Sequence, residues 1–128
     1  MIRRTINIDD YWKVIVYYNI NYNFFNIISR ELKRYGASNS TIRRIYNRMS
    51  KGKAKAVTIS FYEEKVSIVL FNNHKLYYDY INSIIHEAEH IKQSMLYVYN
   101  VYDSGEPPAY TIGYLASQMI MLLNLNLN

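Results

Sequence analysis

The chain of 128 residues contains no cysteine. This absence excludes disulfides, thiolate metal ligands and a cysteine nucleophile, so histidine and carboxylate side chains are the strong metal ligands that remain. Proline and glycine are scarce, with 2 and 4 residues, and neither a linker between domains nor an internal repeat stands out. Length and composition predict one domain over residues 1–128, with a frayed tail at 124–128.

Long apolar runs are also missing. Half of the residues are hydrophobic, yet no uninterrupted apolar run approaches the roughly 20 residues that a membrane-spanning helix needs. Near the start, Asp9, Asp10 and Lys13 stand where a signal peptide would need an apolar stretch. We therefore expect a cytoplasmic protein with no membrane partner.

Positive charge is concentrated in the first part of the chain. Residues 1–55 hold 12 Lys and Arg against 3 Asp and Glu, whereas residues 56–128 hold 3 against 7. The basic part reads as a helix, a turn at Gly36 and an Arg-bearing helix, which superficially resembles a helix-turn-helix, and a positive face attracts phosphates. A nucleic-acid-binding module using the basic residues 43–55 is therefore one alternative, although solvated helix faces often show the same pattern.

Hydrophobic periodicity predicts helices and strands in a mixed order. The predicted elements are a strand at 11–18, a helix at 22–35 ended by Gly36, a shorter helix capped by Ser40 and ending near Gly52, a β-hairpin at 56–71, a long helix at about 78–100 and a last helix from about Pro108 to Leu123. Because proline disfavours the helical region for the residue before it, Glu106 and Pro107 are expected to be extended.

The long predicted helix contains an H-E-x-x-H sequence, from His86 to His90. Residues four apart in a helix lie one above the other, so His86 and His90 can bind one metal ion while Glu87 reaches a water on that ion. Glu89 lies on another side and is expected to face solvent or to pair with Lys or Arg. The spacing therefore predicts a zinc-hydrolase type of site, with Glu87 as general base.

A catalytic zinc site normally has three protein ligands and an open position for water. The carboxylates that follow His90 are Asp103 and Glu106. We favour Glu106, because its diproline neighbour fixes its direction, and keep Asp103 as the alternative. About ten helical residues after His90 carry the chain roughly 15 Å away at 1.5 Å per residue, so the following loop must recover that distance.

The stretch IHEAEHIKQ, followed by EPPAYTIGYL, resembles short metallopeptidase-like proteins of phages and mobile elements of gut bacteria. More broadly it is similar to the glutamate-liganded branch of the zincins. The resemblance implies an α+β fold, in which a small sheet of about three strands packs on the H-E-x-x-H helix, with two N-terminal helices and one C-terminal helix. It also implies zinc at His86, His90 and Glu106, with Glu87 as the base. Tyr110 is the candidate hydroxyl donor to the oxyanion.

These observations predict a zinc-dependent metallopeptidase-like protein that hydrolyses peptide bonds. Its peptide or protein substrate could add as a strand to an exposed edge of the 56–71 hairpin. One alternative is a non-catalytic, zinc-stabilised structural or interaction protein of a phage or mobile element, which would then also be found in the virion. The basic nucleic-acid-binding module is the other alternative.

Overall fold

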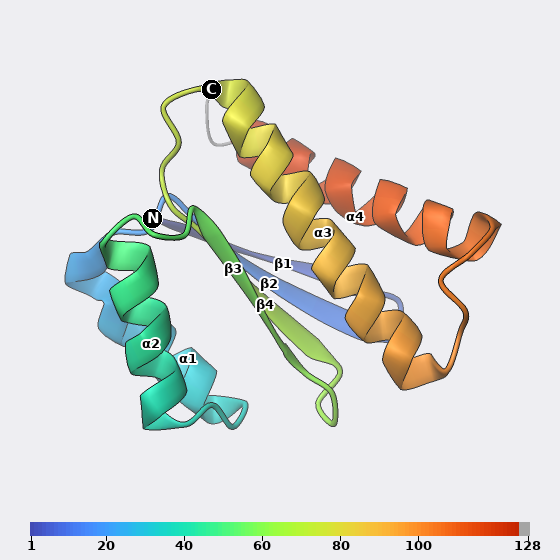
Figure 1. Cartoon of the computed structure of the whole chain (residues 1–128), viewed down its shortest axis with the longest axis horizontal. Coiled ribbons are helices and arrows are strands. Elements are labelled where there is room, and N and C mark those ends of the chain that lie inside the picture. The colour runs from blue at the N-terminus through green and yellow to red at the C-terminus, as the bar shows by residue number, and fades with distance from the viewer. Residues whose placement is uncertain (126–128) are drawn as a thin grey trace.

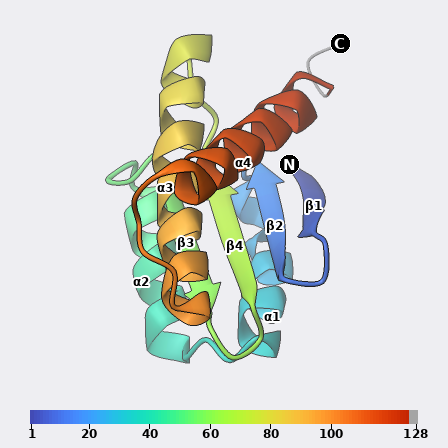
Figure 2. The ribbon, with the colours of Figure 1, turned by 90° about the vertical axis from the view of Figure 1, so that its right-hand side faces the viewer.

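The computed structural model describes residues 1–125 and shows a mixed sheet between two pairs of helices (Figure 1). The elements are β1 (Ile2–Ile8), β2 (Trp12–Tyr18), the 3-10 turn η1 (Tyr22–Phe24), α1 (Phe25–Arg34), α2 (Asn39–Ser50), β3 (Ala56–Phe61), β4 (Val66–Phe71), α3 (Tyr77–Tyr99) and α4 (Glu106–Asn124). The α1–α2 pair covers one face of the sheet, and α3 and α4 cover the other (Figures 1 and 2). The predicted α+β class is confirmed.

The strand order is β1-β2-β4-β3. β2 is antiparallel to β1 and parallel to β4, and β3 is antiparallel to β4. The central strands β2 and β4 are covered on both faces, which explains why both are nearly continuous apolar runs. β3 is an edge strand, so one row of its backbone N–H and C=O groups has no strand beside it.

β1 is the fourth strand, which the sequence analysis did not predict. It pairs along its whole length with β2, but Ile6 is its one buried residue, so apolar alternation is weak in its sequence. Arg3 projects from β1 and forms an ion pair with Glu31 of α1, with Nη2 and Oε2 2.9 Å apart. Pairing with β2 closes a local hairpin over residues 9–11, whereas the ion pair with α1 is a tertiary contact that local sequence does not reveal.

The two N-terminal helices lie close to their predicted positions, although α1 begins at Phe25, after the 3-10 turn, rather than at residue 22. Gly36 has a φ of 110° and follows α1, as expected for a residue that ends a helix. Ser38 caps α2, since its hydroxyl oxygen accepts the Thr41 N–H at 3.2 Å, so the predicted cap at Ser40 is two residues late. The buried residues of α2 are Ile42, Ile45 and Met49.

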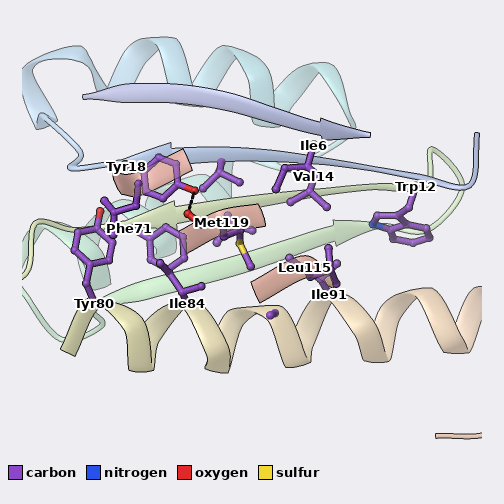
Figure 3. Packing of buried hydrophobic residues seen from close by; sticks show 14 of the residues in the cluster. Ile6, Trp12, Val14, Tyr18, Phe71, Tyr80, Ile84, Ile91, Leu115 and Met119 are labelled. Atoms are coloured by element: carbon purple, nitrogen blue, oxygen red, sulfur yellow. Dashed lines mark hydrogen bonds between the residues drawn. The ribbon is translucent and has the colours of Figure 1, made fainter. Parts of the chain in front are cut away.

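The core on the other face joins the sheet to α3 and α4 (Figure 3). Buried Ile84 and Ile91 of α3 meet Leu115 of α4 in this cluster. The hydroxyl of Tyr18 on β2 donates to the carbonyl of Met119 on α4 at 2.7 Å, so α4 is tied to the middle of the sheet. Figure 2 shows α3 lying on the β3 side while α4 crosses towards β2 and β1.

The start of α4 differs from the prediction. α4 begins at Glu106 rather than near Pro108, and both prolines lie in its first turn. The first N–H groups of a helix have no intrahelical acceptor, so proline is tolerated there. Gly105 precedes the helix with a φ of 81°, and the predicted extended conformation of Glu106 is wrong.

The described part of the chain ends just after α4. α4 ends at Asn124, and residues 126–128 of the predicted frayed tail lie outside the described part of the chain. Within residues 1–125, no helix combines the length and the apolar character that crossing a bilayer requires.

Candidate metal centre

His86 and His90 lie one turn apart on the exposed side of α3 and face each other. Their Nε2 atoms are 3.1 Å apart, and the two rings are nearly perpendicular, with an interplanar angle of 82°. Two imidazole nitrogens bound to one tetrahedral zinc ion at normal bond lengths lie about 3.3 Å apart. The helical spacing therefore brings the two nitrogens together at a separation that a shared cation requires.

Glu87 lies on the side of α3 that faces β3 and is 3% exposed. Burial raises the pKa of its carboxyl group, and the nearby His90, His86 and Thr58 side chains oppose that shift. Thr58 of β3 is close enough to affect this pKa, yet neither Glu87 Oε2 nor Thr58 Oγ1 has a partner with hydrogen-bond geometry. Glu87 is thus a buried carboxylate with an unused acceptor atom beside two imidazoles.

His86, Glu87 and His90 together form a group that could hold a metal ion. One ligand atom from each lies within 4.8 Å of those of the others. Within residues 1–125, no other set of three or more potential ligands is gathered in this way. Imidazole nitrogen and carboxylate oxygen suit zinc, and the orphaned oxygen of Glu87 is where a positive charge would be most stabilising.

The structure does not bring Glu106 or Asp103 to this group. α3 continues from His90 to Tyr99 before the chain turns, and Asp103 then binds Lys92, with Nζ and Oδ1 2.8 Å apart. Lys92 lies two residues after His90, about 200° further round the helix, so Asp103 is held on nearly the opposite side of α3. Glu106 follows at the exposed start of α4 and is not part of the group.

Two other residues considered in the sequence have roles outside the group. Tyr110 is 73% exposed on α4 and does not line the pocket that contains His86, Glu87 and His90. Glu89 pairs with Lys92, with Oε1 and Nζ 2.8 Å apart, as expected for the position between Glu87 and His90 that turns away from them.

The group opens into a pocket of about 530 Å³ between α3 and β3. Arg48 of α2 lines this pocket together with His86 and His90, and so do Tyr62 and Tyr97, whose ring centroids are 5.3 Å apart. These three residues belong to no sequence motif, and no local pattern marks them as part of the site. They are recognised only once the hairpin, α2 and α3 are placed together.

Backbone groups of β3 also face this pocket. The N–H of Asn72 donates to the carbonyl of Lys55 at 3.0 Å, in the register of the β3–β4 ladder. Because antiparallel residues alternate between hydrogen-bonded and non-hydrogen-bonded pairs, Ala56, Thr58 and Ser60 direct their N–H and C=O groups to the open edge. All three also line the pocket.

His74 lies beside the site and links the β4–α3 loop to α3. Its Nδ1 is 2.7 Å from the carbonyl oxygen of Asn72 and its Nε2 is 2.8 Å from the hydroxyl of Ser83 on α3. The ring stacks on Tyr80 at a centroid distance of 4.3 Å. Partial burial lowers the pKa of His74, so the neutral ring that links the β4–α3 loop to α3 is favoured.

No protein-family model, curated protein or solved structure matches the chain. The resemblance to metallopeptidase-like proteins therefore stays a prediction from the motif residues.

Proposed function

We propose that this protein is a zinc-dependent hydrolase that cleaves an extended peptide bound along the edge of β3. The observation that carries the proposal is the position of the His86-Glu87-His90 group, which opens into the same pocket as the unpaired edge of the sheet. A metal-ligand group and a peptide-sized edge are needed together for such a reaction, and they adjoin here.

The side chains have distinct roles in this proposal. His86 and His90 hold zinc through Nε2, and zinc, when bound, supplies Lewis acidity towards water and the scissile carbonyl. Glu87 accepts a proton from the attacking water and returns it to the leaving amine. Its burial supports this role, because a carboxyl group with a raised pKa both takes and releases a proton more readily near neutral pH.

The edge of β3 holds the substrate in the proposal. An extended peptide that adds to this edge exchanges backbone hydrogen bonds with Ala56, Thr58 and Ser60. Thr58 lies beside Glu87, so the peptide bond near Thr58 is presented to the metal centre. This arrangement needs no sequence-specific contact for binding, because the backbone supplies the hydrogen bonds.

The test combines metal content with peptide cleavage. Purified protein loaded with zinc should contain about one ion per chain and cleave an unstructured peptide mixture, with new termini identified by mass spectrometry. His90→Ala should lose zinc and cleavage together, whereas Glu87→Gln should still bind zinc, with lower affinity, and lose cleavage. Cleavage that persists unchanged in Glu87→Gln would rule out the proposed chemistry.

A zinc-stabilised structural role is less well supported by the geometry. His86 and His90 both come from α3, and His90 follows His86 by one turn, so an ion held by them does not cross-link separate elements. If zinc were structural, chelation should unfold the protein. A thermal melt with and without chelator distinguishes the two, because the proposed hydrolase stays folded without its metal.

A further inference from the structure

The pocket at the metal centre continues along β3 into a second pocket, and the two together form a groove. Two arginines of α2 line the part of this groove that lies away from the metal centre. Arg44 and Arg48 are one helical turn apart and line a second pocket of about 320 Å³ that adjoins the first along β3. Arg48 lines both pockets and therefore shares the first pocket with His86, Glu87 and His90. Residues at this spacing project on the same side of a helix, so the two guanidinium groups can contact one anion together.

Neither arginine is neutralised by the protein. Among residues 1–125 the ion pairs use other cations, namely Arg3, Lys55 and Lys92. No acidic residue lines the second pocket, and in the first pocket Glu87 is the acidic residue and is buried. The α2 side of the groove therefore carries two positive charges without a counter-charge.

Backbone hydrogen bonds at the end of α2 and the buried side chains next to the arginines fix the position of the two charges. The carbonyl of Arg48 accepts the N–H groups of Lys53 and Ala54 at 2.9 and 3.2 Å, which anchors the end of α2. The neighbouring Ile45 and Met49 are buried against the sheet. The second pocket thus has an apolar floor and a cationic rim, which suits a side chain with methylene groups and an anionic head.

An extended peptide at the β3 edge would send side chains into this pocket. Successive side chains of a strand point to opposite faces of a sheet, so one of the two residues that flank the cleaved bond must point towards α2. We propose that this residue is acidic, with its carboxylate bound by Arg48 and Arg44. The proposal rests on the proposed peptide hydrolysis and adds the substrate class.

Matched peptides test this preference. Two fluorogenic peptide series, with Glu or Gln placed at each position around one cleavable bond, are compared on the zinc-loaded protein. The Glu peptide should have a kcat/KM about tenfold higher at one flanking position, the size expected for a charged hydrogen bond. Arg48→Gln and Arg44→Gln should reduce this Glu-to-Gln ratio towards one. Arg43→Gln is the matched control, because Arg43 is exposed on the same helix but lines neither pocket.

A binding measurement separates this inference from the hydrolysis itself. Anisotropy of the labelled peptides is measured on the zinc-loaded Glu87→Gln variant, at low and high salt. Tighter binding of the Glu peptide that weakens with salt and disappears in the Arg48→Gln background supports acidic recognition, even if no peptide is cleaved by the wild type. In that case only the hydrolase proposal fails.

Two results would overturn the inference. Equal cleavage and equal binding of Glu and Gln peptides would show that the arginines do not select the substrate. Displacement of the Glu peptide by single-stranded DNA at similar concentration, in an Arg48-dependent manner, would assign the arginines to phosphate binding instead.

Discussion

Replacing Glu87 by glutamine separates the chemical role of this residue from its effect on stability. The substitution keeps the size and shape of the side chain but removes the negative charge and the ability to accept a proton. General base catalysis contributes about 10²–10⁴-fold in rate, so we expect hydrolysis to fall by that factor. At the same time, the metal-free protein should become more stable, because the side chain is buried without a full set of partners.

The size of the stability change follows from the surroundings of the carboxylate. Glu87 is 3% exposed and its Oε2 has no hydrogen-bond partner. A buried acceptor without a partner costs about 1–3 kcal/mol. In Glu87→Gln, the amide can donate to Thr58 Oγ1, which also lacks a partner. We expect a gain of about 1–2 kcal/mol in the free energy of unfolding, or about 3–6 °C in Tm for a chain of this size.

Thermal and urea unfolding of chelator-treated protein measure this gain. The raised pKa of Glu87 means that its charged form is the one that opposes folding, so the advantage of Glu87→Gln should shrink as the pH falls through this raised pKa towards the ordinary carboxyl pKa. Zinc should raise the Tm of the wild type more than that of the variant, because the cation offsets the buried negative charge.

Glu89→Gln is the control. Glu89 is a partly exposed neighbour that pairs with Lys92, and its replacement should change stability by less than about 1 kcal/mol. A metal-free Glu87→Gln protein that is less stable than the wild type would show that the buried carboxylate does not destabilise the fold.

Three further predictions follow from other parts of the structure. Leu115→Ala should lower the free energy of unfolding, measured by urea denaturation, by about 2–5 kcal/mol, because Leu115 is fully buried between α4 and α3. Met121→Ala, at a half-exposed position of the same helix, should change this free energy by less than about 1 kcal/mol. Glu106→Ala should retain stoichiometric zinc, because Glu106 is not part of the ligand group; loss of zinc would show that the start of α4 reaches the histidines. Burial lowers the pKa of His74. Its stabilising contribution is therefore complete above its ordinary pKa and is lost as the pH falls towards the folded-state value. The drop in Tm from pH 8 to pH 5 should be smaller for His74→Gln than for the wild type.

Much of the fold could be predicted from local sequence. The helical and two-residue periodicities located four helices, the hairpin and β2 within a few residues, because each element buries one regular face. β1 was missed, since it has one buried residue and depends on its pairing with β2. The start of α4 was placed too late, because the first helical turn tolerates proline and Gly105 supplies the preceding turn.

The candidate site also has one part that local sequence predicts and one part that it does not. His86 and His90 meet because a helix places residues four apart on one side, and that is a local property of the chain. Whether Asp103 or Glu106 can be a third ligand depends on where the loop after α3 places them. The binding of Asp103 to Lys92 on the other side of the helix is a contact that residue spacing does not encode.

Local sequence fixes a helix with two adjacent imidazoles and a glutamate beside them, because these residues lie within one helical turn and need no other part of the chain. The packing of separate elements buries Glu87 beside Thr58, places the open edge of β3 next to the histidines, and brings Arg48 into the same pocket. Those relations join residues from α2, β3 and α3, and only the packing of these elements on the sheet brings them within reach of one another.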